Sequence, residues 1–589
     1  MKKIIALFAL SACLVGCDDL FEPAIENNLG LEYMYENSQY AEGILSNGYT
    51  RIPNNGYSFN DVATDDAVSN DATNNWRRIT AGTWRSDNNP GERWRDCRAA
   101  IHYINLFLSG ADKVHWADDE VVAKMFCDRE KAEAYGLRAM YMYFLLQAHA
   151  GWTADGELMG VPIVTEPEDV SSNFNYPRNT FAECLKALKD DAALALQVLP
   201  YEYGDPEAMQ KLASKYPEAT AGQINRVFST NFIGRMSGRI VEAIVAQADL
   251  LAASPAYSEG SGVKWEQAAN SAATVLDAIG GVAGMDPTGW TWYCNTTDIA
   301  NMSNVNTPKE ILWRGERGNS RSLEQDNFPP TLYGNGRVNP TQNLVNAFPM
   351  ANGYPIADSQ SGYDASNPYE GRDPRLAAYI LYNGATAGNA NKAIESTADG
   401  TTNDALNKVV GKSTRTGYYL RKLLRQDVNL DPAAPQDQYH YTPRIRYTEI
   451  FLAYAEAANE AWGPTGTGGN DYSAYDVIKA IRSRAGLGVG GYDGYLESIK
   501  DSKEQMRELI RNERRLELCF EGFRFWDLRR WKADLKETAQ GISITNVEGV
   551  LNYNVLDVET REFQDYMYYG PIPYSEVLKF SELKQNKGW

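Results

Sequence analysis

The chain has 589 residues and a formal net charge of −20 at pH 7. This charge repels phosphate backbones and anionic lipid headgroups, so it argues against nucleic acid as a partner and against polybasic docking to a membrane. A neutral ligand is more compatible with it. The 36 Tyr and 13 Trp supply many rings that combine a large apolar face with a polar group for hydrogen bonding.

The N-terminus has the pattern of an export signal. Lysines at 2–3 precede an apolar run at 4–15 that is too short to span a bilayer, and Cys17 follows soon after. This order is typical of a bacterial lipoprotein signal, so we expect residues 1–16 to be removed and Cys17 to carry lipid. The protein would then be anchored to a membrane without crossing it. An ordinary secretory signal with an incidental cysteine is the alternative.

The next elements along the chain are helices. Apolar residues recur at spacings of three and four, which predicts one buried face on each helix. The strongest patterns lie at Arg129–Ala150, at Phe228–Ala253, in the segment that begins at Tyr447, and at Lys503–Lys532. Shorter candidates lie at 38–49, 94–108, 181–199, 265–279 and 474–485. Such helix pairs resemble tetratricopeptide-type hairpins, which stack because a single hairpin cannot bury its own apolar face.

Two regions interrupt the helices with turn-forming residues. The longer one is rich in Gly and Pro and contains strand candidates at 310–314 and 417–423, so we expect loops and brief strands that carry ligand contacts. The predicted fold is therefore mainly α, a helical hairpin scaffold with a loop-rich insert. The expected single domain, 17–589, divides into a scaffold at about 36–280 and 443–535, an insert at about 281–442, further ligand loops at about 54–90, and a C-terminal extension at 536–589.

Cysteine and histidine usage indicates neither a metal site nor a cofactor. Five cysteines remain besides the two at 13 and 17, and an odd, scattered set does not form a disulfide framework, although one isolated bridge stays open. The four histidines show none of the usual zinc-binding spacings and no local motif for a nucleophile triad. We therefore predict no metal ligands and no catalytic residues.

Four separated stretches carry a more specific signal. They are Arg129–Ala139 followed by Gly160–Val164, Arg446–Glu460 followed by Ile481–Leu487, Arg511–Trp531, and Pro571–Pro573 with Gln585–Asn586. Together with the lipoprotein start, they resemble the SusD/RagB family of outer-membrane nutrient-binding lipoproteins of Bacteroidetes. The resemblance spans essentially the whole mature chain. It implies a surface-exposed, lipid-anchored protein of the outer membrane that passes glycans to a SusC-like TonB-dependent transporter.

The charged residues of the third stretch suit a structural role. Arg514 lies three residues before Glu517, and Glu508 lies three before Arg511, so each pair can meet on a helix. We expect Glu513, Glu517 and Glu521 to belong to partly buried charge networks that fix how helices meet, and not to act in catalysis.

Aromatic residues in polar, Gly-rich surroundings are the candidate ligand contacts. A sugar ring has an apolar face that stacks on exposed aromatic rings and a hydroxyl edge that hydrogen-bonds to amides, carboxylates and guanidinium groups. The predicted contacts are Trp76, Trp84, Asn75, Arg85, Trp290, Trp292 and Tyr333. For each ring, the alternative is that it packs in a core.

The sequence favours a non-enzymatic protein that captures an oligosaccharide. Two other classes stay open. A surface glycoside hydrolase would use a pair of carboxylates, and the chain has many Asp and Glu. A purely structural helical adaptor would bind no small ligand, and its aromatic loops would be core or partner surface.

Overall fold

The computed structural model describes residues 30–54, 56–303 and 305–589. Cys17 and the signal at 1–16 lie outside these residues, so the lipid anchor stays a prediction. None of the helices in the described ranges combines the length and apolar character that a membrane span requires. The five cysteines beyond position 17 form no disulfide with one another in the part of the chain that the structure describes.

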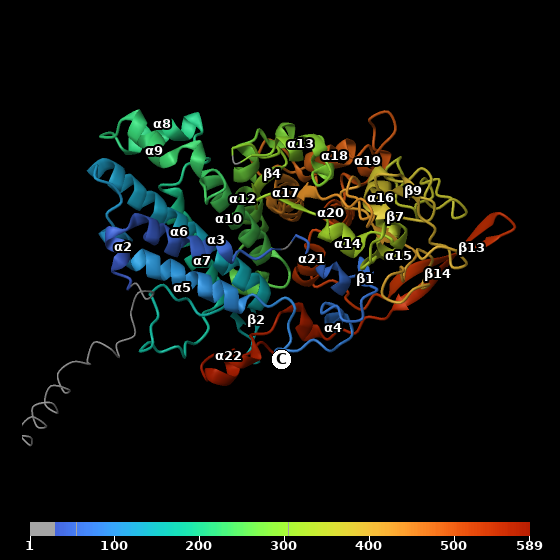
Figure 1. The fold of residues 1–589 in the computed structure, drawn as a ribbon, viewed down its shortest axis with the longest axis horizontal. Helices are drawn as coiled ribbons and strands as arrows, with labels where there is room; N and C mark the ends of the chain where they lie inside the picture. The colour runs from blue at the N-terminus through green and yellow to red at the C-terminus, as the bar shows by residue number, and fades with distance from the viewer. Residues whose placement is uncertain (1–29, 55, 304) are drawn as a thin grey trace, which may run out of the picture.

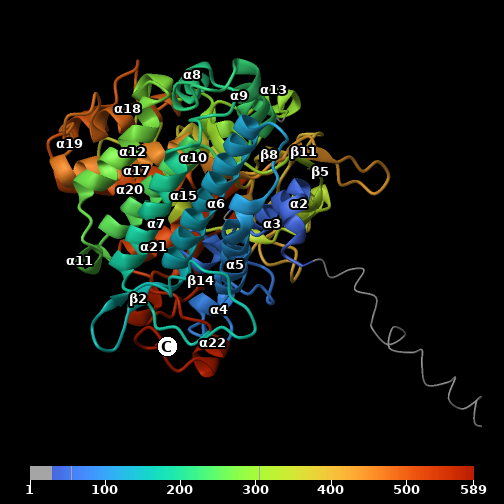
Figure 2. The same ribbon diagram turned by 90° about the vertical axis from the view of Figure 1, so that its left-hand side faces the viewer.

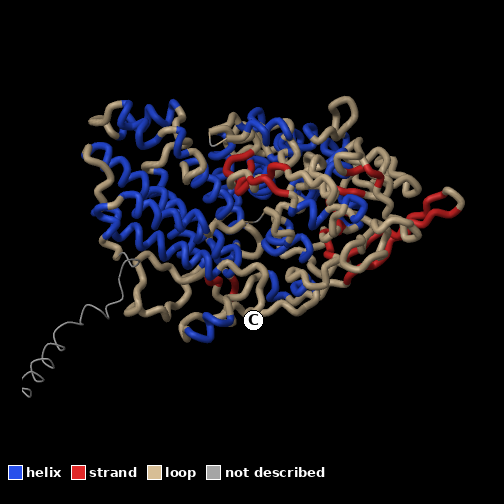
Figure 3. The backbone as a smooth tube through the Cα atoms, in the orientation of Figure 1, coloured by secondary structure: helices blue, strands red, loops and turns tan. Residues whose placement is uncertain are grey.

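The molecule has a helical half and a loop-rich half (Figures 1 and 3). The long helices are α3 (Ser38–Thr50), α5 (Trp94–Gly110), α6 (Glu120–His149), α7 (Phe181–Leu196), α10 (Gly238–Ala253), α12 (Trp265–Asp277), α17 (Tyr447–Trp462), α18 (Ala474–Arg484) and α20 (Lys503–Glu517). In this half, α3 packs on α5, α5 on α6, α6 on α7, α7 on α10, α10 on α12, and α12 on α17. Figure 2 shows this stack from the side. The prediction of a mainly α, tetratricopeptide-like scaffold is confirmed.

Both halves also contain short helices. They are α2 (Tyr33–Glu36), α4 (Arg77–Thr80), α8 (Pro206–Lys215), α9 (Ala221–Phe228), α11 (Ser258–Ser261), α13 (Thr296–Asn301), α14 (Ser322–Asn327), α15 (Gln342–Ala347), α16 (Pro374–Tyr379), α19 (Gly494–Ile499), α21 (Arg524–Arg530) and α22 (Tyr574–Lys579).

The strands form two-stranded antiparallel pairs. These are β1 (Ala67–Ser69) with β6 (Val338–Pro340), β2 (Gly151–Trp152) with β3 (Leu158–Met159), β4 (Ile311–Arg314) with β12 (Pro443–Arg446), β5 (Gly318–Ser320) with β11 (Gln438–His440), β7 (Ile380–Leu381) with β10 (Tyr419–Leu420), β8 (Thr386–Ala387) with β9 (Lys392–Ala393), and β13 (Ala539–Val547) with β14 (Val550–Glu559). Most of these pairs lie in the loop-rich half, and β13 and β14 project from it as a hairpin (Figure 1).

Local signals explain where the helices begin. The Asp119 side chain caps α6 by accepting hydrogen bonds from the backbone N–H groups of Val121 and Val122, each at 3.0 Å. The helix therefore begins nine residues before the predicted start at Arg129. Thr180 and Glu183 form a reciprocal capping box at the start of α7.

Two predicted long helices are broken in the structure. The segment 228–253 divides into the end of α9 and the whole of α10, with Gly234 between them at φ +98°. The segment 503–532 divides into α20 and α21, because Phe520 and Gly522 adopt left-handed backbone conformations at φ +63° and +82°. A continuous helix cannot contain such residues.

A buried network of arginine and carboxylate groups joins the two halves. Arg375, at the start of α16 in the loop-rich half, lies 2.8 Å from Glu513 and 3.0 Å from Glu517 of α20. Arg446 lies 2.7 Å from Glu521. The expected structural role of these three glutamates agrees with this geometry. The prediction that Arg514 pairs with Glu517 was wrong, because Arg514 Nε donates instead to Asp527 Oδ2 at 2.7 Å.

Candidate functional site

An open groove of about 530 Å³ lies where the loop before β1 meets the insert. We call it the aromatic groove. Its lining residues are Tyr57, Ser58, Phe59, Asp71, Asn74, Ser320, Ser322, Leu323, Asp326, Asn327, Arg337, Val338 and His440. The lining thus combines two aromatic rings with amide, carboxylate, hydroxyl, imidazole and guanidinium groups. This is the mixture expected of a site that recognises a polar ring with an apolar face.

The two aromatic residues of the groove have a strained backbone. Tyr57 and Phe59 lie in the left-handed region at φ +60° and +47°, which bulky residues rarely adopt. Such strain persists only where the surroundings impose it, and it is concentrated at binding and catalytic sites. The Tyr57 hydroxyl donates to the Tyr441 carbonyl oxygen at 2.9 Å, which fixes one ring. Both side chains are half-buried.

Polar groups from both walls face this groove. Asp71 accepts hydrogen bonds from the backbone N–H and the hydroxyl of Thr73, and these bonds hold the pKa of Asp71 below its usual value. Across from it, Arg337 Nη1 lies 3.9 Å from Asp71 Oδ2 and donates to the Gly411 carbonyl at 3.1 Å. Asp71 therefore stays ionised near neutral pH and serves as an acceptor.

The opposite wall comes from the β5–β11 pair and α14. His440 of β11 is paired with Gly318 of β5, and its Nε2 lies 2.8 Å from Glu324 Oε1 of α14. Asp326, on the same helix, is exposed. The β5–β11 pairing and the contact between His440 and Glu324 therefore fix the position of this wall.

Two of the predicted platforms are buried, which corrects the prediction that their rings face solvent. Trp84 is 4% exposed because Phe525 and Trp589 pack edge-on against it, and its Nε1 donates to Asn89 Oδ1 at 3.0 Å. Trp292 is 3% exposed and packs against Tyr441, with ring centroids 5.4 Å apart.

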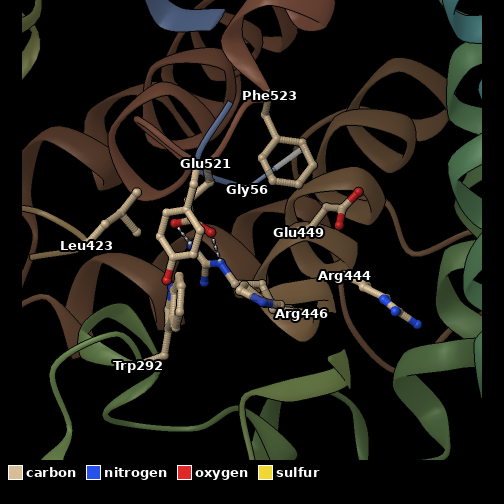
Figure 4. A pocket seen from close by; sticks show the side chains of 10 residues that line it. Gly56, Trp292, Leu423, Arg444, Arg446, Glu449, Glu521 and Phe523 are labelled. Carbon is tan, nitrogen blue, oxygen red and sulfur yellow. Dashed lines mark hydrogen bonds and ion pairs between the residues drawn. The ribbon is translucent and has the colours of Figure 1, made fainter. Parts of the chain in front are cut away.

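Trp292 nevertheless lies close to one residue of the groove, Tyr57. It lines a small cavity of about 20 Å³ together with Tyr57, Arg446 and Glu521 (Figure 4). Because Tyr441 contacts Trp292 and accepts the Tyr57 hydroxyl hydrogen bond, the indole helps to hold Tyr57 in place.

The other predicted contacts are accessible but do not line the aromatic groove. Trp76 and Trp290 are half-buried and pack edge-on against Phe525 and Tyr379, respectively. Asn75 and Arg85 are exposed, and the Arg85 Nε donates to Asp87 Oδ1 at 2.8 Å. Tyr333 is 50% exposed, at φ +65°. A ligand-binding role for these residues stays a prediction.

Sequence reasoning missed the groove's own aromatic residues. Tyr57 and Phe59 lie within the predicted ligand loops at 54–90, in the run Asn-Asn-Gly-Tyr-Ser-Phe-Asn that begins at position 54. Two rings among turn-forming residues were the available signal, whereas the predicted platforms were four Trp and Tyr333. Arg337 and His440 carried no local signal, because only the strand pairing brings them to this site.

Comparison with known proteins agrees with this architecture. The model of the SusD family matches residues 309–589, and a second model, described as starch-binding and associating with the outer membrane, matches residues 37–228. SusD-like protein P2 of Formosa agariphila is 29% identical over 147 residues, which is 25% of this chain and 25% of that protein. SusD-like protein P38 of the same organism is 35% identical over 88 residues. The chain thus matches about a quarter or less of the length of these curated relatives.

Solved structures share the fold over nearly the whole chain. A SusD-like protein of Bacteroides fragilis has a TM-score of 0.69 at 22% identity and covers 96% of this chain and 100% of its own. A SusD-like carbohydrate-binding protein of the same species has a TM-score of 0.67 at 21% identity, with coverage of 94% and 100%. Surface glycan-binding protein A of Bacteroides fluxus has a TM-score of 0.58 at 16% identity, also with 94% and 100%. With the family models matching both parts of the chain, this protein belongs to the SusD/RagB family.

Proposed function

We propose that this protein binds an oligosaccharide in the aromatic groove and holds it without cleaving it. The observation that carries the proposal is the strained aromatic pair, Tyr57 and Phe59, at the base of a groove rimmed by Asp71, Asn74 and Arg337. The rings offer apolar faces to a sugar, and the rim offers donors and acceptors to its hydroxyl groups. Carbohydrate binding by the relative from Bacteroides fragilis supports the same class of ligand.

The groove chemistry favours binding over hydrolysis. A glycosidase needs one carboxylic acid that stays protonated near neutral pH to protonate the leaving group. Asp71 is the opposite case, since hydrogen bonds from Thr73 lower its pKa. The buried Glu517 is also unsuited. Burial alone would raise its pKa, but Arg484, Arg375 and Arg446 outweigh that effect and lower the pKa to about 2.

The proposal extends to location and partner. Lipid on Cys17 would hold the protein at the outer membrane, and the acidic pair that follows this cysteine suits export to the cell surface. There, the protein would present its glycan to a SusC-like TonB-dependent transporter. The description of the family model, as associating with the outer membrane, supports this location. Co-purification of the transporter with the lipidated protein from native membranes tests the partner.

The binding test replaces a ring while keeping the backbone conformation. Phe59→Asn removes the ring and introduces a residue that tolerates the left-handed region. We expect it to weaken oligosaccharide binding by about 2 kcal/mol, the size typical of a buried aromatic contact, in isothermal titration with a glycan selected on an array.

Tyr492 provides the control. It is also aromatic, and it is exposed outside the groove, so Tyr492→Asn should leave the affinity unchanged. If Tyr333→Asn or Trp290→Ala abolishes binding while Phe59→Asn has no effect, the groove assignment is wrong. New reducing ends on incubation with the glycan would instead support the hydrolase alternative.

A further inference from the structure

A second pocket, apart from the aromatic groove, is dominated by arginine. It has a volume of about 260 Å³ and lies between the start of α10 and the β4–β12 pair. We call it the arginine pocket. Its lining residues are Tyr49, Ile233, Gly234, Arg235, Arg239, Ile240, Thr307, Leu312, Trp313, Arg314, Gly315, Glu316 and Arg444. Four guanidinium groups around one small pocket are unexpected in a chain with a net charge of −20.

Two of the four arginines are neutralised by the protein. Arg235 lies 2.7 Å from both Glu130 and Glu133, and Arg239 forms an ion pair with Glu202. Even so, the Nε of Arg239 is buried and has no hydrogen-bond partner among the described residues. These two residues fix the helical side of the pocket.

The other two arginines lack a carboxylate partner in the described part of the chain. The Nη atoms of Arg314 donate to the carbonyls of Gly315 and Ser303, at 3.1 and 2.6 Å, while its buried Nε has no partner. The Arg444 guanidinium lies 4.5 Å from the Trp313 ring centroid and makes no hydrogen bond to the described residues. Figure 4 shows that the Arg444 side chain points away from the Arg446–Glu521 pair.

Burial makes this arrangement costly without an anion. Desolvation lowers the pKa of both Arg314 and Arg444, which means that their surroundings disfavour the positive charge. The only acidic side chain that lines the pocket is Glu316, which is exposed and forms no ion pair with either arginine within the described residues. Its charge raises the pKa of both arginines but offsets their desolvation only in part. An oxyanion next to either guanidinium group would accept charge-assisted hydrogen bonds and offset the desolvation of that group.

The arginine pocket lies close to the aromatic groove along two segments. Gly315 lines the pocket and Ser320 lines the groove, so they are five positions apart, a span of at most about 18 Å. On the partner strands, Arg444 and His440 are four residues apart, a span of at most about 14 Å. One oligosaccharide of a few units is long enough to reach both sites.

From these contacts, we infer that the arginine pocket binds the carboxylate group of an acidic sugar. Trp313 holds the Arg444 guanidinium in place, and Arg314 is held by two backbone carbonyls, so both cations are positioned before the anion arrives. The inference deepens the proposed function by naming a ligand class, acidic glycans. That the ligand is a sugar rests on the proposed function, whereas anion binding by the pocket does not.

The test uses the mature full-length chain and three probes: inorganic sulfate, glucuronate and glucose. Titration at low ionic strength should show glucuronate binding that sulfate displaces and that added salt weakens, while neutral glucose does not bind at this site. Arg444→Gln should weaken glucuronate binding about tenfold, the size expected for a lost hydrogen bond to a charged group. Glu316→Gln should strengthen it, because a like charge leaves the rim.

Arg95→Gln is the matched control, since Arg95 is an exposed arginine outside both sites, and it should change nothing. The inference is overturned if Arg444→Gln and Arg314→Gln both leave glucuronate affinity unchanged, or if glucose binds as well as glucuronate. Sulfate binding without glucuronate binding would also overturn the acidic-sugar assignment, because the pocket would then take a free anion. Loss of neutral-oligosaccharide binding in Phe59→Asn, measured in parallel, reports on the proposed function separately.

Discussion

The helical half and the loop-rich half reach stability in different ways. In the helical half, helices pack side by side, and their buried faces are built from small and apolar residues such as Ala139, Leu137 and Ala458. In the loop-rich half, paired strands are two to four residues long apart from the projecting hairpin, and several bulky residues have positive φ, including Phe59 and Tyr333. The regular half supplies rigidity, and the irregular half supplies the strained rings, so the proposed binding site lies where local preferences are violated.

The largest expected effect comes from breaking the charged connection between the halves. Glu517→Gln would remove one of the carboxylates that neutralise the buried Arg375 and Arg484, and we expect a loss of about 3–5 kcal/mol in the free energy of unfolding. Urea denaturation measures this loss. The matched control is Glu508→Gln on the same helix, where the side chain is exposed and the change should stay within about 0.5 kcal/mol.

The same residue predicts a dependence on acid. The folded-state pKa of Glu517, about 2, is below the ordinary value of 4.5. Its contribution to stability is therefore present above pH 4.5 and is lost as the pH falls toward 2. The difference in stability between wild type and Glu517→Gln should shrink over that range. A difference that does not vary with pH would show that the network does not depend on the charge of Glu517.

A smaller effect of opposite sign is expected inside the helical half. Burial raises the pKa of Glu449 from 4.5 to about 7, and Gln247 donates to its Oε1 at 2.7 Å. Because the folded pKa is raised, the contribution of Glu449 is fully present below pH 4.5 and is lost as the pH rises through 7. Relative to Glu449→Gln, the wild type should lose up to about 3 kcal/mol between these values, measured by denaturation at each pH. Equal curves for both proteins would contradict this.

The smallest effect is expected at the projecting β13–β14 hairpin. Val550, near the turn, is 64% exposed, so Val550→Thr should change the free energy of unfolding by no more than about 0.5 kcal/mol and leave glycan binding unchanged. A loss above about 1 kcal/mol would indicate that the tip packs against the body of the protein. The hairpin would then contribute to the packing of the loop-rich half and would not simply project from it.

Much of the scaffold could be predicted from the sequence, because periodic apolar positions determine helices locally. The extent of α6 was underestimated because its cap at Asp119 precedes the strongest pattern. The breaks at Gly234 and Phe520 depend on backbone conformations that periodicity does not report. The family resemblance also rested on local motifs, and the family models bear it out.

The candidate site was less accessible to prediction. Trp84 stands among polar residues in sequence, yet Trp589 and Phe525 cover it from more than 400 positions away. Tyr57 and Phe59 had a weak signal in their turn-forming neighbours, but their left-handed backbone is visible only in the structure. The arginine pocket is assembled by pairing β4 with β12, which are distant in sequence, so no local pattern could have indicated it.

A crystal structure with a bound neutral oligosaccharide tests the central claim most directly. The account predicts a sugar ring against the faces of Tyr57 and Phe59, with hydroxyl groups hydrogen-bonded to Asp71, Asn74 or Arg337. A ligand seated on Trp76 or Trp290, with the aromatic groove empty, would contradict it.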